Sequence, residues 1–262
     1  MNNVYVKSAG VVFGDEPDYK AFLSPMQSRR MGTLLKRALV CSLQVMKAGG
    51  VMLPDAIVCG TALGCMRNTE LFMEKHTPTP FMQSTHNTVS SLIAIHTHCH
   101  GYNSTYSQGR LSFASALLDA FLQIRAGEIH TALVGAHDEA TDNTLALLPS
   151  TWRPAEGYDF TEGSASLILT DSPDWALCRI SDIRISRISI SDTRISDITT
   201  GLNTMSSDDD EYDYMTHFGD GFASSGMGTC EAARLIGEGK ISSARIVARE
   251  GEYAAKIVLQ RE

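Results

Sequence analysis

Apolar residues recur at helical spacing over the stretch 106–127, YSQGRLSFASALLDAFLQIRAG. Positions such as Phe113, Leu117, Phe121 and Ile124, together with the alanines between them, cover most of a helix circumference. The pattern therefore predicts a buried helix rather than a surface helix with one apolar face. Gly127 ends the helix. The run that follows, IHTALVGAHDEA, is short and apolar, which predicts a buried strand.

The rest of the chain alternates in the same way. A polar loop is expected from the end of this strand to about Asp159, and EGEY is expected to form a hairpin turn between the last two strands. We expect strands at 4–13, 55–65, 160–171, 243–250 and 253–261, and helices at 24–48, 68–75, 87–96 and, from Gly219 onward, 219–240. This order of elements predicts an α/β fold in layers around a largely buried sheet.

Composition changes after Pro173. The tract 179–200 is rich in Ile, Ser, Arg and Asp, and its isoleucines do not keep one parity. We expect one or two strands there, with a bulge or turn near Ser186-Arg187. The segment 206–214, SSDDDEYDY, is expected to be an acidic, solvated loop rather than a cation site, because it lacks a defined ligand loop.

Charge and cysteine content exclude several classes of protein. The chain has 262 residues, a formal net charge of −8 and a pI of about 5.5, which argue against nucleic acid or an anionic membrane as a partner. No apolar stretch reaches the ~20 residues that span a bilayer, and the N-terminus lacks the pattern of a signal peptide. The six cysteines form no CxxC pair. We expect reduced, mainly buried thiols in a cytoplasmic protein.

The turn before the central helix, Ser107-Gln108-Gly109, has the form of a nucleophile elbow. A tight turn leading from a strand into a buried helix places backbone N–H groups and the positive end of the helix dipole beside a nucleophile. The candidate position for that nucleophile carries Arg110. A guanidinium has no acceptor capacity and cannot attack a thioester, so we expect Arg110 to face an anion, a carboxylate or solvent.

The segment GYNSTYSQGRLSFASALLDAFLQIRAGEIHTALVGAHDEA resembles the active-site region of β-ketoacyl-acyl-carrier-protein synthases. RRMGTLLKRAL, IVCGTALGCMRNTE, FTEGSASLILTD and GDGFASSGMGTCEAARLIGEGK resemble further family segments in the same order. The resemblance implies a thiolase-like fold with two β/α halves in an α-β-α-β-α arrangement. It implies a single domain over 1–262, with an N-terminal half at 1–172 and a shortened C-terminal half at 173–262.

The departures from the family pattern concern its catalytic residues. The family's nucleophilic cysteine falls on Arg110, with Ser107 and Ser112 at the flanking serine positions, and one family histidine falls on Asp220. The segment with the second histidine has no counterpart. The resemblance therefore implies a catalytically degenerate chain, with no cofactor, that is similar to chain-length factors, the inactive partners of active ketosynthases. Short factors of this kind accompany polyene-type pigment synthesis.

The resemblance also implies partners. The strand before the elbow, made of Ser104, Thr105, Tyr106, Ser107 and Gln108, is expected to pair across a two-fold dimer, because an open edge strand needs covering. Phe81, Met82 and Gln83 are expected near that interface, where they close the partner's acyl tunnel. The partner is an active ketosynthase subunit or a second copy of this chain. An acidic acyl carrier protein is expected to bind the ketosynthase instead of this acidic chain.

Several alternatives stay open at this point. Cys65 or Cys99 as a relocated nucleophile would make the chain an active acyltransferase or 3-oxoacyl synthase, and a free-standing scaffold protein is a third class. On a strand, His96, His98 and His100 would share one face and could hold a metal. The resemblance instead places them at a helix end and turn, where they do not converge, so we expect no metal. His217 and Asp220 form either an acid–base pair or a helix cap. The acyl product is also open.

Overall fold

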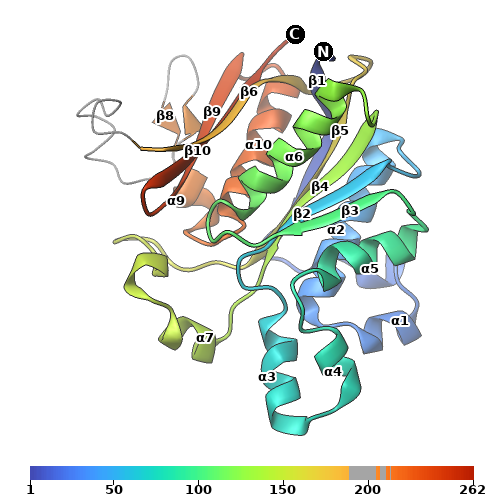
Figure 1. Ribbon diagram of the computed structural model, residues 1–262, viewed down its shortest axis with the longest axis vertical. Coiled ribbons are helices and arrows are strands. Elements are labelled where there is room, and N and C mark those ends of the chain that lie inside the picture. Colours follow the sequence, from blue (N-terminus) through green and yellow to red (C-terminus); the bar gives the residue numbers. More distant parts are fainter. Residues whose placement is uncertain (189–204, 207–210, 213) are drawn as a thin grey trace.

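The computed structural model describes residues 1–188, 205–206, 211–212 and 214–262, and these form a layered α/β fold (Figure 1). One sheet runs in the order β3-β2-β4-β5-β1-β6-β10-β9-β7-β8. Its strands are β1 (Val4–Val12), β2 (Ala56–Gly60), β3 (Tyr102–Tyr106), β4 (Thr131–Asp138), β5 (Gly163–Thr170), β6 (Cys178–Arg187), β7 (Met205–Ser206), β8 (Glu211–Tyr212), β9 (Ser243–Glu250) and β10 (Tyr253–Gln260). The helices are α1 (Pro25–Arg30), α2 (Thr33–Gly49), α3 (Met66–Lys75), α4 (Pro78–Met82), α5 (Thr88–Thr97), α6 (Ser112–Ala126), α7 (Asp142–Leu147), α9 (Tyr214–Phe218) and α10 (Ser224–Gly237).

Strand direction places the important loops at one edge of the sheet. β2 pairs in parallel with both β3 and β4, whereas β1 and β5 pair antiparallel with their neighbours. The carboxyl ends of parallel strands meet at one edge, which is where open α/β sheets hold their sites. The segments that follow β2, β3 and β4 therefore begin close together.

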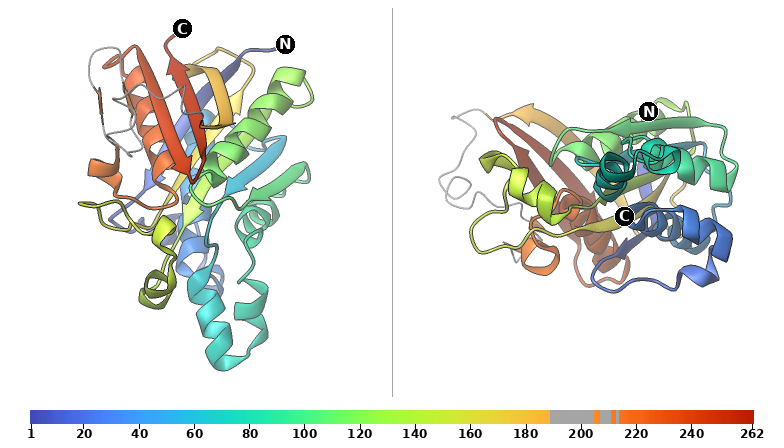
Figure 2. Two further views of the ribbon diagram at one scale, coloured as in Figure 1. Left: turned by 60° about the vertical axis from the view of Figure 1, so that its left-hand side comes forward. Right: turned by 90° about the horizontal axis from the view of Figure 1, so that it is seen from below.

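The helices form two layers around the sheet. α2 and α5 cover one face of the N-terminal strands, where the buried residues include Leu39, Ile57 and Leu133. α6 and α10 lie on the other face, and β6, β10 and β9 fold over them from the opposite side (Figure 2). Within the described part of the chain, no helix covers the outer face of those three strands. The expected α/β fold in layers around a largely buried sheet is thus confirmed.

The central helix shows why the sequence favours this layering. α6 buries Phe113, Leu117, Ala120 and Ile124 against strands of both halves, as expected from apolar residues around most of its circumference. Gly127 adopts φ +79° and its N–H bonds to Ile124 O, which ends the helix.

Some expected boundaries were wrong. The helix expected at 24–48 is two helices, because Met31 and Gly32 take extended backbone between α1 and α2. The loop expected up to Asp159 contains α7, and the strand before the elbow begins at Tyr102 and ends at Tyr106.

In β6, the register shifts at Ser181, and the strand ends at Arg187. The isoleucines of the biased tract beyond Ile188, and most of the acidic segment 206–214, lie outside the described residues. No described helix is long and apolar enough to cross a bilayer.

Candidate functional site

The elbow follows β3 and turns the chain into α6. Gly109 adopts φ +57°, a conformation that favours glycine. Ser112 stabilises the turn: its hydroxyl accepts the Gln108 N–H at 2.8 Å and donates to Gly109 O at 2.7 Å. Ser112, which matches a flanking serine of the family segment, therefore stabilises the turn. Ser107 donates to Ala62 O at 3.4 Å.

Arg110 turns inward, toward a carboxylate. Its guanidinium forms an ion pair with Asp220, and the two side chains are 11% and 4% exposed. It also donates to the backbone oxygen of Arg153 at 3.2 Å and lies 5.5 Å from the ring centre of Phe222. The other Asp220 oxygen accepts the Ala155 N–H at 2.8 Å. The structure therefore joins two of the positions identified from the sequence in one buried ion pair.

The backbone N–H of Arg110 is also occupied. It donates to Glu250 Oε2 at 2.8 Å, and Glu250 Oε1 accepts the Trp152 indole N–H at 2.9 Å. A Cβ on Gly109 would lie 2.3 Å from the same carboxylate. An N–H at this position of an elbow is suited to stabilising developing negative charge on a substrate. In this chain the Arg110 N–H is instead bound by the Glu250 carboxylate.

Sequence reasoning missed Glu250 and Trp152. They are 140 and 42 residues from Arg110 in the chain, so no local pattern connects them. Beside them lies a cavity of about 490 Å³, which is lined by Ser107, Gln108, Gly109, Leu111, Trp152, Ile185, Glu250 and Tyr253.

His217 is not part of the elbow. It is exposed on α9, with its ring 5.3 Å from that of Phe218. The cap interpretation of Asp220 was wrong: α10 begins after Ala223 without a side-chain cap, and Ser224 Oγ accepts the Gly221 N–H at 2.9 Å. Asp220 instead neutralises Arg110.

The cysteines are buried away from solvent. Burial raises the pKa of Cys65 to about 12, with the charges of Glu139 and Asp138 acting in the same direction. The Cys99 thiol donates to Pro54 O at 3.2 Å. A nucleophilic cysteine needs an exposed, electropositive setting that favours the thiolate, and the buried Cys65, beside two acidic side chains, lacks it.

The three histidines lie at the end of α5. His96 is in its last turn, and His98 adopts φ +57° as the residue after the helix. Among the described residues, no group of three or more His, Cys, Asp and Glu side chains is arranged to hold a metal.

The edge strand and the predicted tunnel residues form a second region. β3 is the outermost strand, so in the described chain one edge of Ser104, Thr105 and Tyr106 has no strand beside it. α3 and α4 form a helical hairpin, 66–82, that projects from the body below β2 and β3 (Figure 1); we call it the arm.

Side chains at the end of α4 and directly after it differ in exposure. Phe81 and Met82 are 56% and 72% exposed, and the Phe81 ring packs 4.9 Å from that of Phe72. Gln83 instead turns inward and donates to Arg30 O at 2.6 Å.

An acidic pair, Asp138 and Glu139, ends β4 and was also missed, although two acids directly after an apolar strand are visible in the sequence. The Asp138 carboxylate accepts the hydroxyl of Thr61 at 3.0 Å and the backbone N–H of Leu63 at 2.8 Å. Burial raises the pKa of Asp138 to about 7, and the bonds from the loop oppose that shift. The pair ties the loop after β2 to the sheet.

Solved structures with this fold include ketosynthases and their complexes. A chain of the AntDE:AntF complex, a type II PKS acyl-carrier protein with its ketosynthase bound to the hexaketide, matches with a TM-score of 0.78 and 14% identity over 100% of both chains. The ishigamide ketosynthase/chain length factor matches with 0.74 and 15% over 99% of both. The ketosynthase ApeO in complex with its chain length factor ApeC, from Xenorhabdus doucetiae, matches with 0.60 and 14% over 100% of both.

No curated protein matches the chain by sequence. The family model described as "Beta-ketoacyl synthase, N-terminal domain" matches residues 8–187, which is more than half of the chain. The chain therefore belongs to the β-ketoacyl synthase family.

Proposed function

We propose that this chain is a non-catalytic, chain-length-factor-type partner of an active ketosynthase in fatty-acid or polyene (polyketide-like) biosynthesis. The observation that carries the proposal is the buried pair of Arg110 and Asp220 at the elbow. A guanidinium cannot form an acyl-enzyme, and the Asp220 carboxylate is already engaged by that guanidinium and by the Ala155 N–H. Glu250 occupies the N–H group that would otherwise face a thioester oxygen.

The alternative is an acyltransferase or 3-oxoacyl synthase with a relocated cysteine. Burial raises the pKa of Cys65 to about 12, which favours its unreactive thiol form. Cys99 is buried, and its thiol donates to Pro54 O at 3.2 Å. Incubation with an acyl-carrier-protein thioester followed by intact-mass measurement separates the two. We expect no acyl adduct; a stable adduct on Cys65 or Cys99 would favour the enzyme.

The partner is expected to bind at the β3 edge. A sheet edge without a neighbour favours strand addition. Tyr102 on this strand and Ile95 on α5 are 43% and 73% exposed. We propose a pseudo-two-fold dimer through β3, with a ketosynthase or, in its absence, a second copy of this chain. Because the chain is acidic, an acidic acyl carrier protein would bind the ketosynthase instead. We propose that the assembly acts in the cytoplasm.

The arm supplies the mechanism. Phe81 and Met82 are large, apolar and exposed in the isolated chain. If they extend into the partner's acyl cavity, their size sets where the growing chain stops, and a smaller side chain lets it grow further. Exclusion by side-chain volume is how an apolar pocket discriminates by length, at about 10–200-fold per methylene.

Co-expression with a candidate ketosynthase tests the proposal. We expect co-purification, and products longer by at least one extension unit for Phe81→Ala or Met82→Ala. Met52→Ala is the matched control, because Met52 is 89% exposed but lies outside the arm. An active ketosynthase that neither needs nor retains this chain, with product length unchanged by the substitutions, would refute it.

A further inference from the structure

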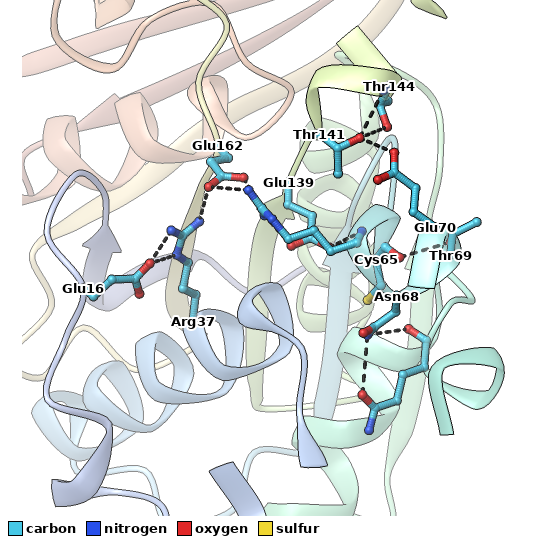
Figure 3. Close-up of polar contacts among 12 residues, drawn as sticks. Glu16, Arg37, Cys65, Asn68, Thr69, Glu70, Glu139, Thr141, Thr144 and Glu162 are labelled. Carbon is cyan, nitrogen blue, oxygen red and sulfur yellow. Dashed lines mark hydrogen bonds and ion pairs between the residues drawn. The ribbon is translucent and has the colours of Figure 1, made fainter. Parts of the chain in front are cut away.

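The N-terminus of α3, the first helix of the arm, is capped by a residue from another part of the chain. α3 begins after Cys65, which makes no side-chain cap bond. The first N–H groups of a helix lack partners within the helix, and a carboxylate satisfies them well. Here the Arg67 N–H donates to Glu139 Oε1 at 3.0 Å (Figure 3). The cap of the arm is therefore a residue at the end of β4.

The Arg67 side chain extends this attachment. Its guanidinium lies 2.7 Å from Glu139 Oε2 and 2.8 Å from Glu162 Oε2, and Glu162 also accepts from Arg37 at 2.9 Å (Figure 3). Glu16 pairs with Arg37 at the far end. Charges thus alternate from the first loop to the arm.

Burial strengthens this row of charges at one end. The Glu139 side chain is only 2% exposed, whereas those of Arg67 and Glu162 are 39% and 27% exposed. Desolvation raises the pKa of Glu162, but the bonds from Arg67 and Arg37 outweigh it and leave the pKa below its usual value. Paired charges in a partly buried setting are screened less than surface pairs.

Two more polar contacts hold the base of the arm. Glu70 accepts from Thr141, and Gln83, the residue after α4, donates to Arg30 O at 2.6 Å. Met66, at the start of α3, adds an apolar contact with the core. In α3 and α4 only Asn68 and Pro80 are buried. The ring contact of Phe72 and Phe81 joins the two helices of the arm to each other. Polar bonds at the base therefore set the direction of the arm.

From these contacts we infer that Arg67 is a positioning residue for length control: its ion pairs with Glu139 and Glu162 fix the direction in which the arm presents Phe81 and Met82 to the partner. The inference rests on the proposed function. A fixed arm places the end of the acyl cavity at one depth, whereas a loosened arm places it at several depths. The expected phenotype of losing Arg67 is thus a broader distribution of product lengths, rather than the uniform lengthening expected from Phe81→Ala.

The first measurement uses the isolated chain, so it does not depend on a partner. Hydrogen exchange of peptides covering 66–82 is compared between the native chain, Arg67→Met and Arg67→Lys. We expect exchange at least tenfold faster for Arg67→Met, a smaller increase for Arg67→Lys, and no change in β4 and β5. Lys75→Met is the matched control, because Lys75 is exposed on the same helix. Unchanged exchange in the Arg67 variants would overturn the inference.

The second measurement is product length in the assembled complex. We expect the spread of lengths to widen by one or more extension units for Arg67→Met, and by less for Arg67→Lys, with Lys75→Met like the native chain. If Arg67→Met does not fold, Arg67→Lys carries the test, because it keeps the charge but cannot bridge both carboxylates in the same geometry. Faster arm exchange with an unchanged product distribution would overturn the positioning role, while the Phe81 and Met82 variants would still decide the proposed function.

Discussion

The elbow and the arm follow the carboxyl ends of neighbouring parallel strands, yet their side chains have opposite settings. At the elbow, Arg110 and Asp220 are buried and satisfied by groups of the same chain. On the arm, Phe81 and Met82 are more than half exposed. A group that is already satisfied has little to offer a ligand, whereas exposed apolar side chains gain by meeting a partner. This difference supports the proposal that the chain acts through a partner rather than as a catalyst.

The largest effect on stability is expected at the elbow, where the ion pair of Arg110 and Asp220 is buried. Asp220→Ala leaves the Arg110 guanidinium buried without its partner, which costs about 3–5 kcal/mol of unfolding free energy. The double variant Arg110→Met with Asp220→Leu should recover most of that loss, because apolar replacement of a buried pair is often nearly neutral. Urea denaturation measures both.

A surface ion pair gives the scale for this test. Arg187 and Glu252 are 69% and 68% exposed and lie 2.7 Å apart. Glu252→Gln should change stability by less than about 0.5 kcal/mol. If Asp220→Ala costs no more than this control, the elbow does not depend on its ion pair, and the contrast with the arm loses its energetic basis.

A smaller effect is expected from the core beneath both regions, where His137 lies fully buried on β4. Burial lowers the pKa of His137 to about 3, so the folded state keeps it neutral while the unfolded chain takes up a proton below about 6.5. Its contribution to stability is therefore complete above pH 6.5 and is lost as pH falls. Between pH 8 and pH 5 the loss is about 2 kcal/mol.

Denaturation of the native chain and His137→Leu at both pH values isolates this term from other groups, such as Asp138, whose raised pKa acts in the opposite direction. The difference in unfolding free energy between the two proteins should change by about 2 kcal/mol. His217→Leu, at an exposed position, is the matched control. A difference that stays constant with pH would show that His137 is not held neutral by the fold.

Sequence predicted the framework better than the site. The period of apolar residues and the terminal glycine identified α6, because both are local features. The break at Gly32 and the short helix α7 were missed, since a single glycine or one turn of helix barely alters the apolar period. The elbow position of Arg110 followed from the family resemblance.

Arg110 was expected to face an anion, a carboxylate or solvent, but which residues face it could not be predicted, because its partners come from distant segments. Asp220 and Glu250 lie 110 and 140 residues away, and only the folding of the C-terminal strands over α6 brings them to the elbow. The same holds for Glu139 and Arg67, which are 72 residues apart. Spacing along a chain reports helical and strand faces, but long-range ion pairs depend on topology.

The smallest effect on stability is expected on the arm. Met82 is 72% exposed, so Met82→Ser removes little buried area and should change the unfolding free energy of the isolated chain by less than about 0.5 kcal/mol. Phe81→Ala should cost somewhat more, up to about 1 kcal/mol, because it also loses the ring contact with Phe72. Thermal or urea denaturation of the isolated chain measures both.

The small effect on stability is informative when it is compared with the effect on partner binding. A large apolar side chain at an exposed position contributes little to its own fold. We expect it to contribute to binding when a partner covers it, as buried anchor residues do at interfaces. Met82→Ser should therefore weaken retention of a ketosynthase, or lengthen its product, while leaving the isolated chain unchanged. If Met82→Ser instead destabilised the isolated chain as strongly as Asp220→Ala does, the arm would be part of the folded core. The contrast between an elbow whose polar groups are paired within the chain and an arm that presents apolar side chains to a partner would then be wrong.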